Sequence, residues 1–463
     1  MNNQRLELVA DFYEYTMSNG YLNKKMENQI AYFDVFFRKV PDEGGYAIIA
    51  GLEQIINYIK NLSFDEEDIN YLRKQNKFSE EFLNYLENFR FTGDVWAIPE
   101  GTVVFPNEPL ITVRAPIIQA QLLETMLLLT TNHQSLIATK TSRIVKEAQG
   151  RPVMEFGARR AHGINAAVEG ARAAIIGGAI GTSCTLSAKE FNVPASGTMA
   201  HSWVQSFDSE YEAFKTYAEI YPDDCTLLID TYNTIESGLP NAIKVFNEVL
   251  KPKGYKPKAV RLDSGDLAYL SKKVRKILDE AGYTECKICA TNSLDEYLIK
   301  SLIEQDAKID SFGVGENLIT AKSEPVFGGV YKLVGIEKDT KIIPKIKVSE
   351  NVVKVTNPGF KKVYRFYDNE SQKAIADVIA LSDEIIDERE YMIFDPQNPW
   401  KKKLIKDYTI RELQEKIFEN GKLIYKSPTL EEIAKKSKKE LNSIWEEVKR
   451  IENPHKYYVD LSK

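Results

Sequence analysis

The feature that most constrains the fold is a repeat between residues 150 and 335. Short apolar runs there end in Gly, Ser, Thr, Asp or His, and each is followed by an Ala-rich or amphipathic stretch with helical spacing. The runs recur at intervals of roughly 20 to 35 residues, the size of one β/α unit. Their ends lie at residues 156–157, 181–183, 197–198, 230–231, 263–265, 291–292 and 313–315. The repeat therefore predicts successive β/α units and a parallel sheet.

The strands of such a sheet can be arranged in two ways. Residues 225–230 and 258–263 are continuous apolar runs without alternation, as expected for parallel strands buried on both faces. A closed β/α barrel and an open doubly wound sheet both satisfy this pattern. We favour the barrel, because polar residues and glycines end so many successive runs and the active sites of β/α barrels are built at the carboxyl ends of their strands.

The chain is longer than this repeat requires, since its 463 residues exceed the usual size of one domain. Residues 1–135 mix helical and strand-like segments and are expected to form an N-terminal α+β domain. Residues 136–335 are expected to form the barrel. Residues 336–463 are expected to supply strands that complete the N-terminal domain and then to close with amphipathic helices. We place the lysine runs 401–403 and 435–439 on solvated helix faces.

Charge and hydropathy exclude several classes of protein. The 61 Lys and Arg against 67 Asp and Glu give a formal net charge of −6, which argues against broad nucleic-acid binding. No apolar run approaches the roughly 20 residues that span a bilayer, and the first residues lack the apolar core of a signal peptide. We therefore expect a cytoplasmic protein without membrane or nucleic-acid partners. The four cysteines, including Cys286 and Cys289 in a strand-like run, are interpreted as structural.

Arginines mark two of the predicted strands. Arg159 and Arg160 come directly after the strand and glycine at residues 155–157, and Arg261 lies within the run that ends at residue 263. A guanidinium group presents a planar fork that suits phosphate or carboxylate. Ion pairing at a surface or an interface explains the same pattern, so both interpretations stay open for the motif alone.

A histidine, two carboxylates and a pair of glycines mark further strand ends. His201 is placed for proton transfer or nucleophilic attack, with a structural imidazole as the alternative. The carboxylates of Asp230 and Asp263 suit either Mg²⁺, bound together with substrate phosphates, or the hydroxyls of a ribose. Helix capping is the alternative role for both residues. Gly313 and Gly315 form a turn before a short helix, which favours phosphate binding by backbone N–H groups. Together these residues predict a site for a polyphosphorylated sugar with Mg²⁺.

Seven sequence motifs follow one another along nearly the whole chain. They lie at residues 11–21, 36–39, 45–52, 155–163, 197–203, 261–267 and 328–333. In these motifs the chain resembles the nicotinate phosphoribosyltransferase family. The resemblance implies the type II phosphoribosyltransferase fold, an irregular β/α barrel joined to an α+β domain, and a homodimer with shared active sites.

The resemblance also implies a reaction. Nicotinate and 5-phosphoribosyl 1-diphosphate would condense to nicotinate mononucleotide and diphosphate, the first step of NAD salvage from nicotinate. Hydrolysis of ATP would drive this reaction through a transient phosphohistidine, which by motif is His201, and Mg²⁺ would be the cofactor.

Residue roles follow from the same resemblance. Tyr13 and Thr198 would contact nicotinate, with Arg261 at its carboxylate or beside the ribose. Arg159 would stack on or pair with the ligand, and Asp263 would hold the ribose. Independently of the resemblance, the carboxylate of Asp230 at its strand end is the expected Mg²⁺ ligand. The other substrate-binding residues expected at the strand ends are Ser183, Asn292, Gly313 and Gly315.

Two residues depart from the family pattern. Cys184 stands where the family often has Asn, and Glu316 stands where it often has Thr. A carboxylate beside a bound phosphate would repel it unless the side chain turned away. A side-chain contact from residue 316 to phosphate is therefore not expected, whereas backbone contacts from Gly315 are unaffected.

Three other functions compete with this interpretation. A nicotinamide phosphoribosyltransferase would bind a neutral amide, whereas cations near the ring favour the acid. An aldolase or isomerase barrel would need a Schiff-base lysine or a carboxylate base at a strand end, and neither is strongly indicated. A non-catalytic barrel that binds the sugar diphosphate is the third alternative, and turnover would exclude it.

Overall fold

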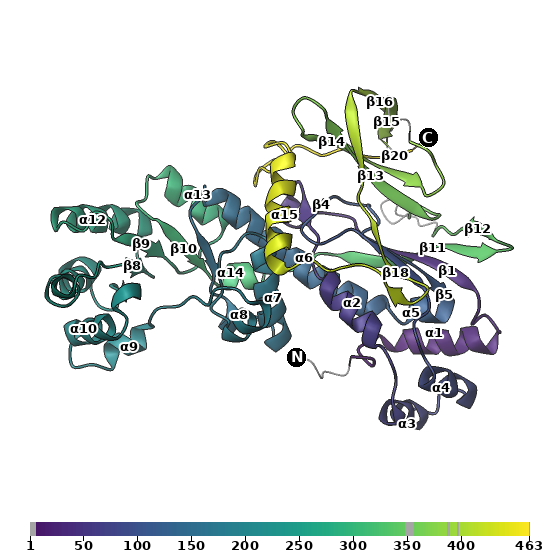
Figure 1. Cartoon of the computed structure of the whole chain (residues 1–463), viewed down its shortest axis with the longest axis horizontal. Coiled ribbons are helices and arrows are strands. Elements are labelled where there is room, and N and C mark those ends of the chain that lie inside the picture. The colour runs from purple at the N-terminus through teal and green to yellow at the C-terminus, as the bar shows by residue number, and fades with distance from the viewer. Residues whose placement is uncertain (1–5, 348–355, 387–388, 396–397, 463) are drawn as a thin grey trace. The chain divides into compact units, whose positions relative to one another are not determined.

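The computed structural model describes residues 6–347, 356–386, 389–395 and 398–462 (Figure 1). The chain divides into two compact units. Unit 1 combines Met1–Thr139 with Val326–Lys463, and unit 2 is Lys140–Pro325. Unit 2 is therefore an insertion between the two halves of unit 1.

Unit 1 contains short helices and several antiparallel strand pairs. Its helices are α1 (Phe12–Asn23), α2 (Leu52–Asn61), α3 (Glu66–Lys74), α4 (Glu80–Glu87), α5 (Ile117–Gln121) and α15 (Leu430–Ser443), and α6 (Glu124–Glu147) begins in it. Its strands are β1 (Ile30–Phe37), β2 (Ala47–Ile48), β3 (Asp94–Ala97), β4 (Val103–Val104), β5 (Ile111–Pro116), β11 (Gly329–Lys338), β12 (Lys341–Pro344), β13 (Lys361–Asp368), β14 (Ala374–Leu381), β15 (Glu390–Asp395), β16 (Asn398–Lys406), β17 (Tyr408–Glu412), β18 (Glu415–Glu419), β19 (Lys422–Leu423) and β20 (Val459–Leu461).

The largest sheet of unit 1 draws strands from both halves of the unit. Its order is β12-β11-β1-β5-β3-β18-β19, so β11 and β18 from the second half pair with β1 and β3 from the first. The aromatic and β-branched sequence of β1 explains its central place, because seven of its eight residues are buried. At the start of α1, Asp11 and Glu14 form the reciprocal capping contacts that their spacing predicts.

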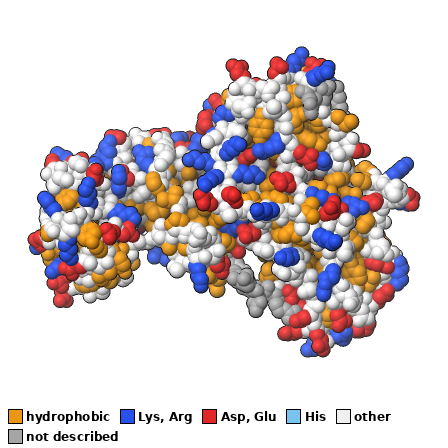
Figure 2. Space-filling model, viewed as in Figure 1, with side chains coloured by type: hydrophobic (Ala, Val, Ile, Leu, Met, Phe, Trp, Pro, Cys, Tyr) orange, Lys and Arg blue, Asp and Glu red, His pale blue; other side chains and the backbone are white. Residues whose placement is uncertain are grey.

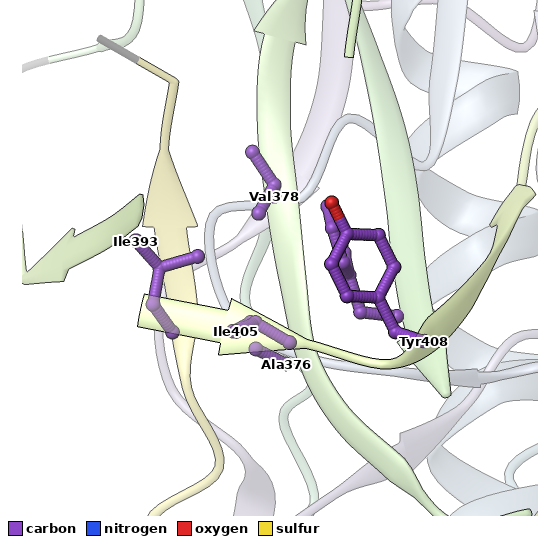
Figure 3. Packing of buried hydrophobic residues seen from close by; sticks show 6 residues of the cluster. Ala376, Val378, Ile393, Ile405 and Tyr408 are labelled. Carbon is purple, nitrogen blue, oxygen red and sulfur yellow. The ribbon is translucent and has the colours of Figure 1, made fainter. Parts of the chain in front are cut away.

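A second sheet, β17-β13-β14-β20, and the hairpin of β15 and β16 share a core. Figure 3 shows Ala376 and Val378 of β14, Ile393 of β15, Ile405 of β16 and Tyr408 of β17 converging on it.

One expectation for this region is wrong, because the lysine run 401–403 lies on strand β16 and not on a helix. A strand with one buried face alternates polar and apolar residues, and three consecutive lysines interrupt this alternation. It continues at Ile405, whose side chain faces the core. The run 435–439 does lie on a helix, α15.

Unit 2 alternates strands and helices through most of its length. Its strands are β6 (Val153–Glu155), β7 (Thr226–Leu228), β8 (Ala259–Leu262), β9 (Lys287–Ala290) and β10 (Ser311–Val314). Its helices are α7 (Ile164–Ile176), α8 (Thr185–Phe191), α9 (His201–Gln205), α10 (Glu210–Ile220), α11 (Leu239–Val245), α12 (Leu267–Glu280), α13 (Glu296–Glu304) and α14 (Glu316–Ile319), together with the end of α6.

The strands of unit 2 form a parallel sheet in the order β6-β10-β9-β8-β7. Two parallel bridges, from Glu155 to Thr182 and from Thr182 to Ala195, extend it beyond β6. Each of the seven strand ends expected from the sequence lies at the end of one of these segments or just after it, and helices lie on both sides of β8, β9 and β10 in Figure 1. The predicted α/β fold with a parallel sheet is confirmed. Within the described residues, the Ala195 segment does not pair with β7.

Two composition-based expectations can be compared with the structure. Cys225, Cys286 and Cys289 are buried and unpaired, and burial raises the pKa of Cys225 and of Cys286 to about 12, which supports a structural role for these thiols. Across the described ranges, no helix combines the length and apolarity needed to cross a membrane. Figure 2 shows charged side chains of both signs spread over the visible face of each unit.

Candidate active site

The carboxyl ends of three neighbouring strands bring the predicted polar residues of unit 2 together. Asp230 follows β7, Asp263 follows β8, and Thr291 follows β9. Because these strands are parallel and adjacent, their carboxyl ends share one edge of the sheet. The sequence prediction that Asp230 and Asp263 lie at strand ends is confirmed.

Asp230 is nearly buried and connects β7 to the turn after β8. Its Oδ2 atom accepts hydrogen bonds from the backbone N–H of Asp263 at 2.8 Å and from the hydroxyl of Ser264 at 2.6 Å. Its Oδ1 atom is buried and has no hydrogen-bond partner among the described residues. An unpaired carboxylate oxygen at this depth is costly unless a ligand satisfies it.

His201 and Asp263 meet at this edge. His201 begins α9, and its Nε2 atom lies 3.5 Å from Oδ2 of Asp263. Its Nδ1 atom lies 3.1 Å from the hydroxyl oxygen of Thr231, and Asp263 in turn accepts a hydrogen bond from the hydroxyl of Thr291. The Asp263 carboxylate favours a proton on Nε2, which leaves the Nδ1 lone pair to accept from Thr231. The two side chains of the pair are still 39% and 34% exposed, so a ligand can reach them.

Arg261 connects β8 to the segment that precedes His201. Its Nη1 atom donates to the hydroxyl of Thr198 at 2.6 Å, and its Nη2 atom donates to the carbonyl of Met199 at 2.8 Å. Its Nε atom is buried without a partner among the described residues. The structure thus brings together Arg261, Thr198 and His201, three residues singled out from the sequence.

The glycines at the end of β10 are explained by a close neighbour. A Cβ atom on Gly313 would lie 2.5 Å from the ring of Phe156, and one on Gly315 would lie 3.1 Å from the carbonyl oxygen of Phe156. The end of β6 therefore packs directly against this turn.

Glu155, at the end of β6, is fully buried. It accepts hydrogen bonds from the hydroxyl of Thr182 at 2.6 Å and from the N–H of Gly157. Burial raises the pKa of Glu155, and these hydrogen bonds lower it in part.

Glu316 is neutralised by two cations. Its Oε1 atom accepts a hydrogen bond from Lys322 at 2.7 Å, and its Oε2 atom lies 3.7 Å from Nε of Arg160. The hydrogen bond from Lys322, and then its charge and that of Arg160, lower the pKa of Glu316. The carboxylate is therefore engaged with side chains, and Arg159 is exposed beside Arg160.

The remaining predicted residues are placed differently. Ser183 is exposed next to Thr182, and its N–H donates to the carbonyl of Glu155. Asn292 is exposed after β9, with a left-handed backbone φ of 80°. Tyr13 lies on α1 in unit 1 and is 43% exposed.

Sequence reasoning missed the hydroxyl and carboxyl groups that hold the cluster in place. Thr231 and Thr291 orient His201 and Asp263, and Thr182 binds Glu155. Each of the three threonines stands at or near the end of an apolar run, which locates it at a strand end but does not show its partner.

The donor set fits a cation that binds mainly through substrate oxygens. The orphaned Oδ1 atom of Asp230 and the partly exposed Asp263 offer one or two carboxylates, as Mg²⁺ commonly uses alongside phosphates. Among the residues that the structure describes, no group of three or more His, Cys, Asp or Glu side chains could hold a metal alone.

Comparison with known protein families covers most of the chain. The model described as the nicotinate phosphoribosyltransferase (NAPRTase) family matches residues 152–357. The models of the N-terminal and C-terminal domains of nicotinate phosphoribosyltransferase match residues 8–132 and 360–463. The three matches lie in chain order.

Individual relatives match over nearly their full length. The chain is 46% identical to a nicotinate phosphoribosyltransferase of Bacillus subtilis over 459 residues, covering 99% of this chain and 93% of the relative. It is 34% identical to a nicotinate phosphoribosyltransferase of Caenorhabditis elegans, covering 98% and 91%.

Solved structures show the same fold. The crystal structure of human nicotinic acid phosphoribosyltransferase matches with a TM-score of 0.87 and 26% identity over 98% of both chains. A nicotinate-nucleotide pyrophosphorylase from Pyrococcus furiosus matches with a TM-score of 0.72 and 24% identity over 94% of this chain and 95% of that one, which shows the fold alone.

Proposed function

Because the chain belongs to the nicotinate phosphoribosyltransferase family, we propose that it transfers the phosphoribosyl group of 5-phosphoribosyl 1-diphosphate to nicotinate. The observation that carries this proposal is the linked set of Arg261, Thr198, His201 and Asp263 at one edge of the parallel sheet. Matches over nearly the full length of the curated relatives support it further.

In this reaction the pyridine nitrogen of nicotinate bonds to C1 of the ribose while the bond from C1 to the diphosphate oxygen breaks. The ring becomes a pyridinium, and diphosphate leaves. We assign the carboxylate of nicotinate to Arg261 and Thr198, whose mutual hydrogen bond at 2.6 Å holds the guanidinium in place before binding. Asp263 is assigned to the ribose, and the backbone of Gly313 and Gly315 to phosphate. Orientation and charge neutralisation supply most of the acceleration in such a displacement.

ATP coupling is the second part of the proposal. His201 takes the γ-phosphoryl group of ATP, so that a nitrogen–phosphorus bond forms as the bond to ADP breaks, and water later releases phosphate. Asp263 holds the proton on Nε2 during both steps, so Nδ1 is the nitrogen that bonds to phosphorus, and its contact with Thr231 breaks as that bond forms. A phosphoryl group there adds charge and acceptor oxygens at the open edge of the sheet, where they can order the sugar diphosphate.

The other assignments complete the proposal. Asp230 would hold Mg²⁺, which offsets the charge of the departing diphosphate when it is bound. Arg159 and the exposed residues Ser183 and Asn292 contact the substrate. Tyr13 offers its exposed ring to nicotinate. We also propose that the protein is a homodimer with shared active sites and that it is located in the cytoplasm.

The test is product formation from 5-phosphoribosyl 1-diphosphate and Mg²⁺ with either nicotinate or nicotinamide, each with and without ATP. We expect nicotinate mononucleotide, formed faster with ATP, and no reaction with nicotinamide, because Arg261 pairs with a carboxylate better than with an amide. Reaction with nicotinamide alone would identify a nicotinamide phosphoribosyltransferase. Binding of the sugar diphosphate without turnover of either base would contradict the enzymatic proposal.

A further inference from the structure

We propose that Thr291 is a positioning residue that determines which nitrogen of His201 accepts the phosphoryl group, because its hydroxyl fixes the direction of the Asp263 carboxylate. This inference rests on the proposed function, in which ATP phosphorylates His201. All three residues belong to unit 2.

The hydroxyl of Thr291 is committed to Asp263. Thr291 follows β9 and is 5% exposed, and its Oγ1 atom donates a hydrogen bond to Oδ1 of Asp263. The same hydroxyl lies 3.4 Å from the carbonyl oxygen of Leu262. A hydroxyl has one proton to donate, and the carboxylate oxygen is the nearer and the charged acceptor. With Oδ1 of Asp263 held in this way, Oδ2 is the oxygen that faces Nε2 of His201, at 3.5 Å.

Backbone contacts leave only the side-chain torsion of Asp263 for Thr291 to control. The N–H of Asp263 donates to Oδ2 of Asp230 at 2.8 Å, and the N–H of Thr291 donates to the carbonyl of Leu262 at 2.9 Å. The main chain of both residues is thus fixed by the sheet and by Asp230. The terminal torsion of an aspartate has a broad, twofold preference, and the Asp263 side chain is 34% exposed. The Thr291 hydroxyl therefore restricts a rotation that would otherwise be open.

The direction of this carboxylate decides the tautomer of His201, and Thr231 on the other side of the ring does not. The Thr231 hydroxyl lies 3.1 Å from Nδ1, and a hydroxyl can either donate to a lone pair or accept from an N–H. It therefore fits both tautomers. An ionised carboxylate can only accept, so Asp263 selects the form with the proton on Nε2.

The tautomer in turn selects the nucleophile. The Nδ1 lone pair forms the bond to the γ-phosphorus as the bond from phosphorus to the oxygen of ADP breaks, and the proton stays on Nε2. The phosphorylated ring then carries a positive charge, which the fixed carboxylate of Asp263 offsets. Without the Thr291 hydroxyl, Asp263 can rotate away, the form with the proton on Nδ1 gains population, and phosphorylation at Nε2 begins to compete.

The first experiment measures the tautomer in the resting protein, without ATP. The full chain is labelled with ¹⁵N-histidine, and comparison with His201→Ala identifies the His201 signals among the four histidines. At pH 9 an ordinary imidazole is neutral, so the ring nitrogen shifts report the tautomer. We expect the ratio of the Nε2–H to the Nδ1–H form to fall about fivefold in Thr291→Val, the effect of one net hydrogen bond. Thr291→Ser keeps the hydroxyl and should restore the wild-type ratio.

The second experiment identifies the phosphorylated nitrogen. The protein is incubated with ATP and Mg²⁺ and quenched in alkali, and ³¹P NMR distinguishes the two phosphohistidine isomers. We expect the Nδ1 isomer in the wild type and in Thr291→Ser, and a mixture with the Nε2 isomer in Thr291→Val. Thr226→Val is the matched control, because Thr226 is a buried threonine at the amino end of β7 and should leave tautomer and isomer unchanged.

The outcomes distinguish a failure of this inference from a failure of the proposed function. A phosphorylated wild type together with an unchanged tautomer ratio, or a single Nδ1 isomer, in Thr291→Val overturns the inference alone. Effects of Thr226→Val equal to those of Thr291→Val also overturn it, because the change would then follow from loss of any buried hydroxyl in the sheet. A wild type that never carries phosphohistidine overturns the proposed ATP coupling, and the inference with it.

Discussion

Two clusters of charged side chains in this protein differ in how completely they are sealed, that is, buried away from solvent. In unit 1, Arg365 is fully buried and donates to both oxygens of Asp377 at 2.8 and 2.6 Å and to Glu440 at 3.2 Å. Tyr457 donates to the same Asp377 at 3.0 Å. In unit 2, the strand-end cluster around His201 and Arg261 is partly exposed and keeps unpaired buried atoms, namely Oδ1 of Asp230 and Nε of Arg261.

The difference separates a structural from a functional use of charge. A buried ion is tolerated only when protein groups satisfy it, and Asp377 and Glu440 pair with Arg365, although Oε1 of the neighbouring buried Glu108 has no hydrogen-bond partner among the described residues. The strand-end cluster leaves polar atoms unsatisfied at an accessible edge, and a substrate can complete it. Substitutions in the sealed cluster should therefore change stability, whereas substitutions in the open cluster should change activity.

The largest effect is expected at His201. In His201→Ala, ATP should no longer stimulate product formation, while a slow reaction without ATP persists, because the proposed phosphoryl acceptor is lost and the substrate-binding groups remain. Initial rates with and without ATP measure this directly. The free energy of unfolding should change by only about 0.5 kcal/mol, since the side chain is partly exposed. Undiminished ATP stimulation in this variant would reject the phosphohistidine assignment.

Arg365→Met should give the largest loss of stability. It leaves Asp377 and Glu440 buried without their cation, and we expect a loss of about 3–5 kcal/mol in the free energy of unfolding. Urea unfolding measures the loss, and kcat of the folded fraction should not change. Arg411→Met is the matched control, because Arg411 also pairs with Glu440 but is 42% exposed and should contribute only about 0–1 kcal/mol. Equal losses in the two variants would refute the distinction between sealed and open charges.

Arg261→Lys should change activity more than stability. Lysine keeps the charge but cannot donate to Thr198 and Met199 in the fork geometry of a guanidinium. We expect kcat/KM for nicotinate to fall about 10- to 100-fold, equivalent to about 1.4–2.8 kcal/mol. Thermal unfolding monitored beside the kinetics is the check, and a loss of stability as large as that of Arg365→Met would place Arg261 in the structural class.

The parallel sheet was predictable because its signal is local. Strands buried on both faces are short continuous apolar runs, so the ends of β7 to β10 could be located residue by residue. The antiparallel sheet of unit 1 was less accessible, because β11 pairs with β1 about 300 residues away in sequence and β18 pairs with β3 across a similar span. The β16 strand was missed because its lysines conceal the alternation.

The candidate site was predictable to the same extent. His201, Asp230 and Asp263 were found because each follows an apolar run. Their partners Thr231 and Thr291 were not, because a hydroxyl at a strand end has no role that the sequence reveals until the neighbouring strand is known.

The smallest effect is expected at Asp460 on β20, a carboxyl group of unit 1 that is intermediate between the two clusters. Burial, and then the charge of Asp395, raise its pKa to about 6, while Lys456 lowers it in part. A carboxyl whose pKa is raised on folding stabilises the folded state below its ordinary pKa, and this contribution is lost as the pH rises through the folded value.

Between about pH 4 and pH 6 the wild type should therefore lose stability that Asp460→Asn keeps. We expect a relative gain of about 1 kcal/mol for the variant, because solvent screens part of the charge. Urea unfolding at pH 4, 5, 6 and 7 measures the gain, with the exposed Asp383→Asn as control. If the free energies of unfolding of the wild type and Asp460→Asn change in parallel with pH across this range, Asp460 is as open to solvent as the groups of the strand-end cluster. A gain much above 1 kcal/mol would instead place it with the sealed charges around Arg365.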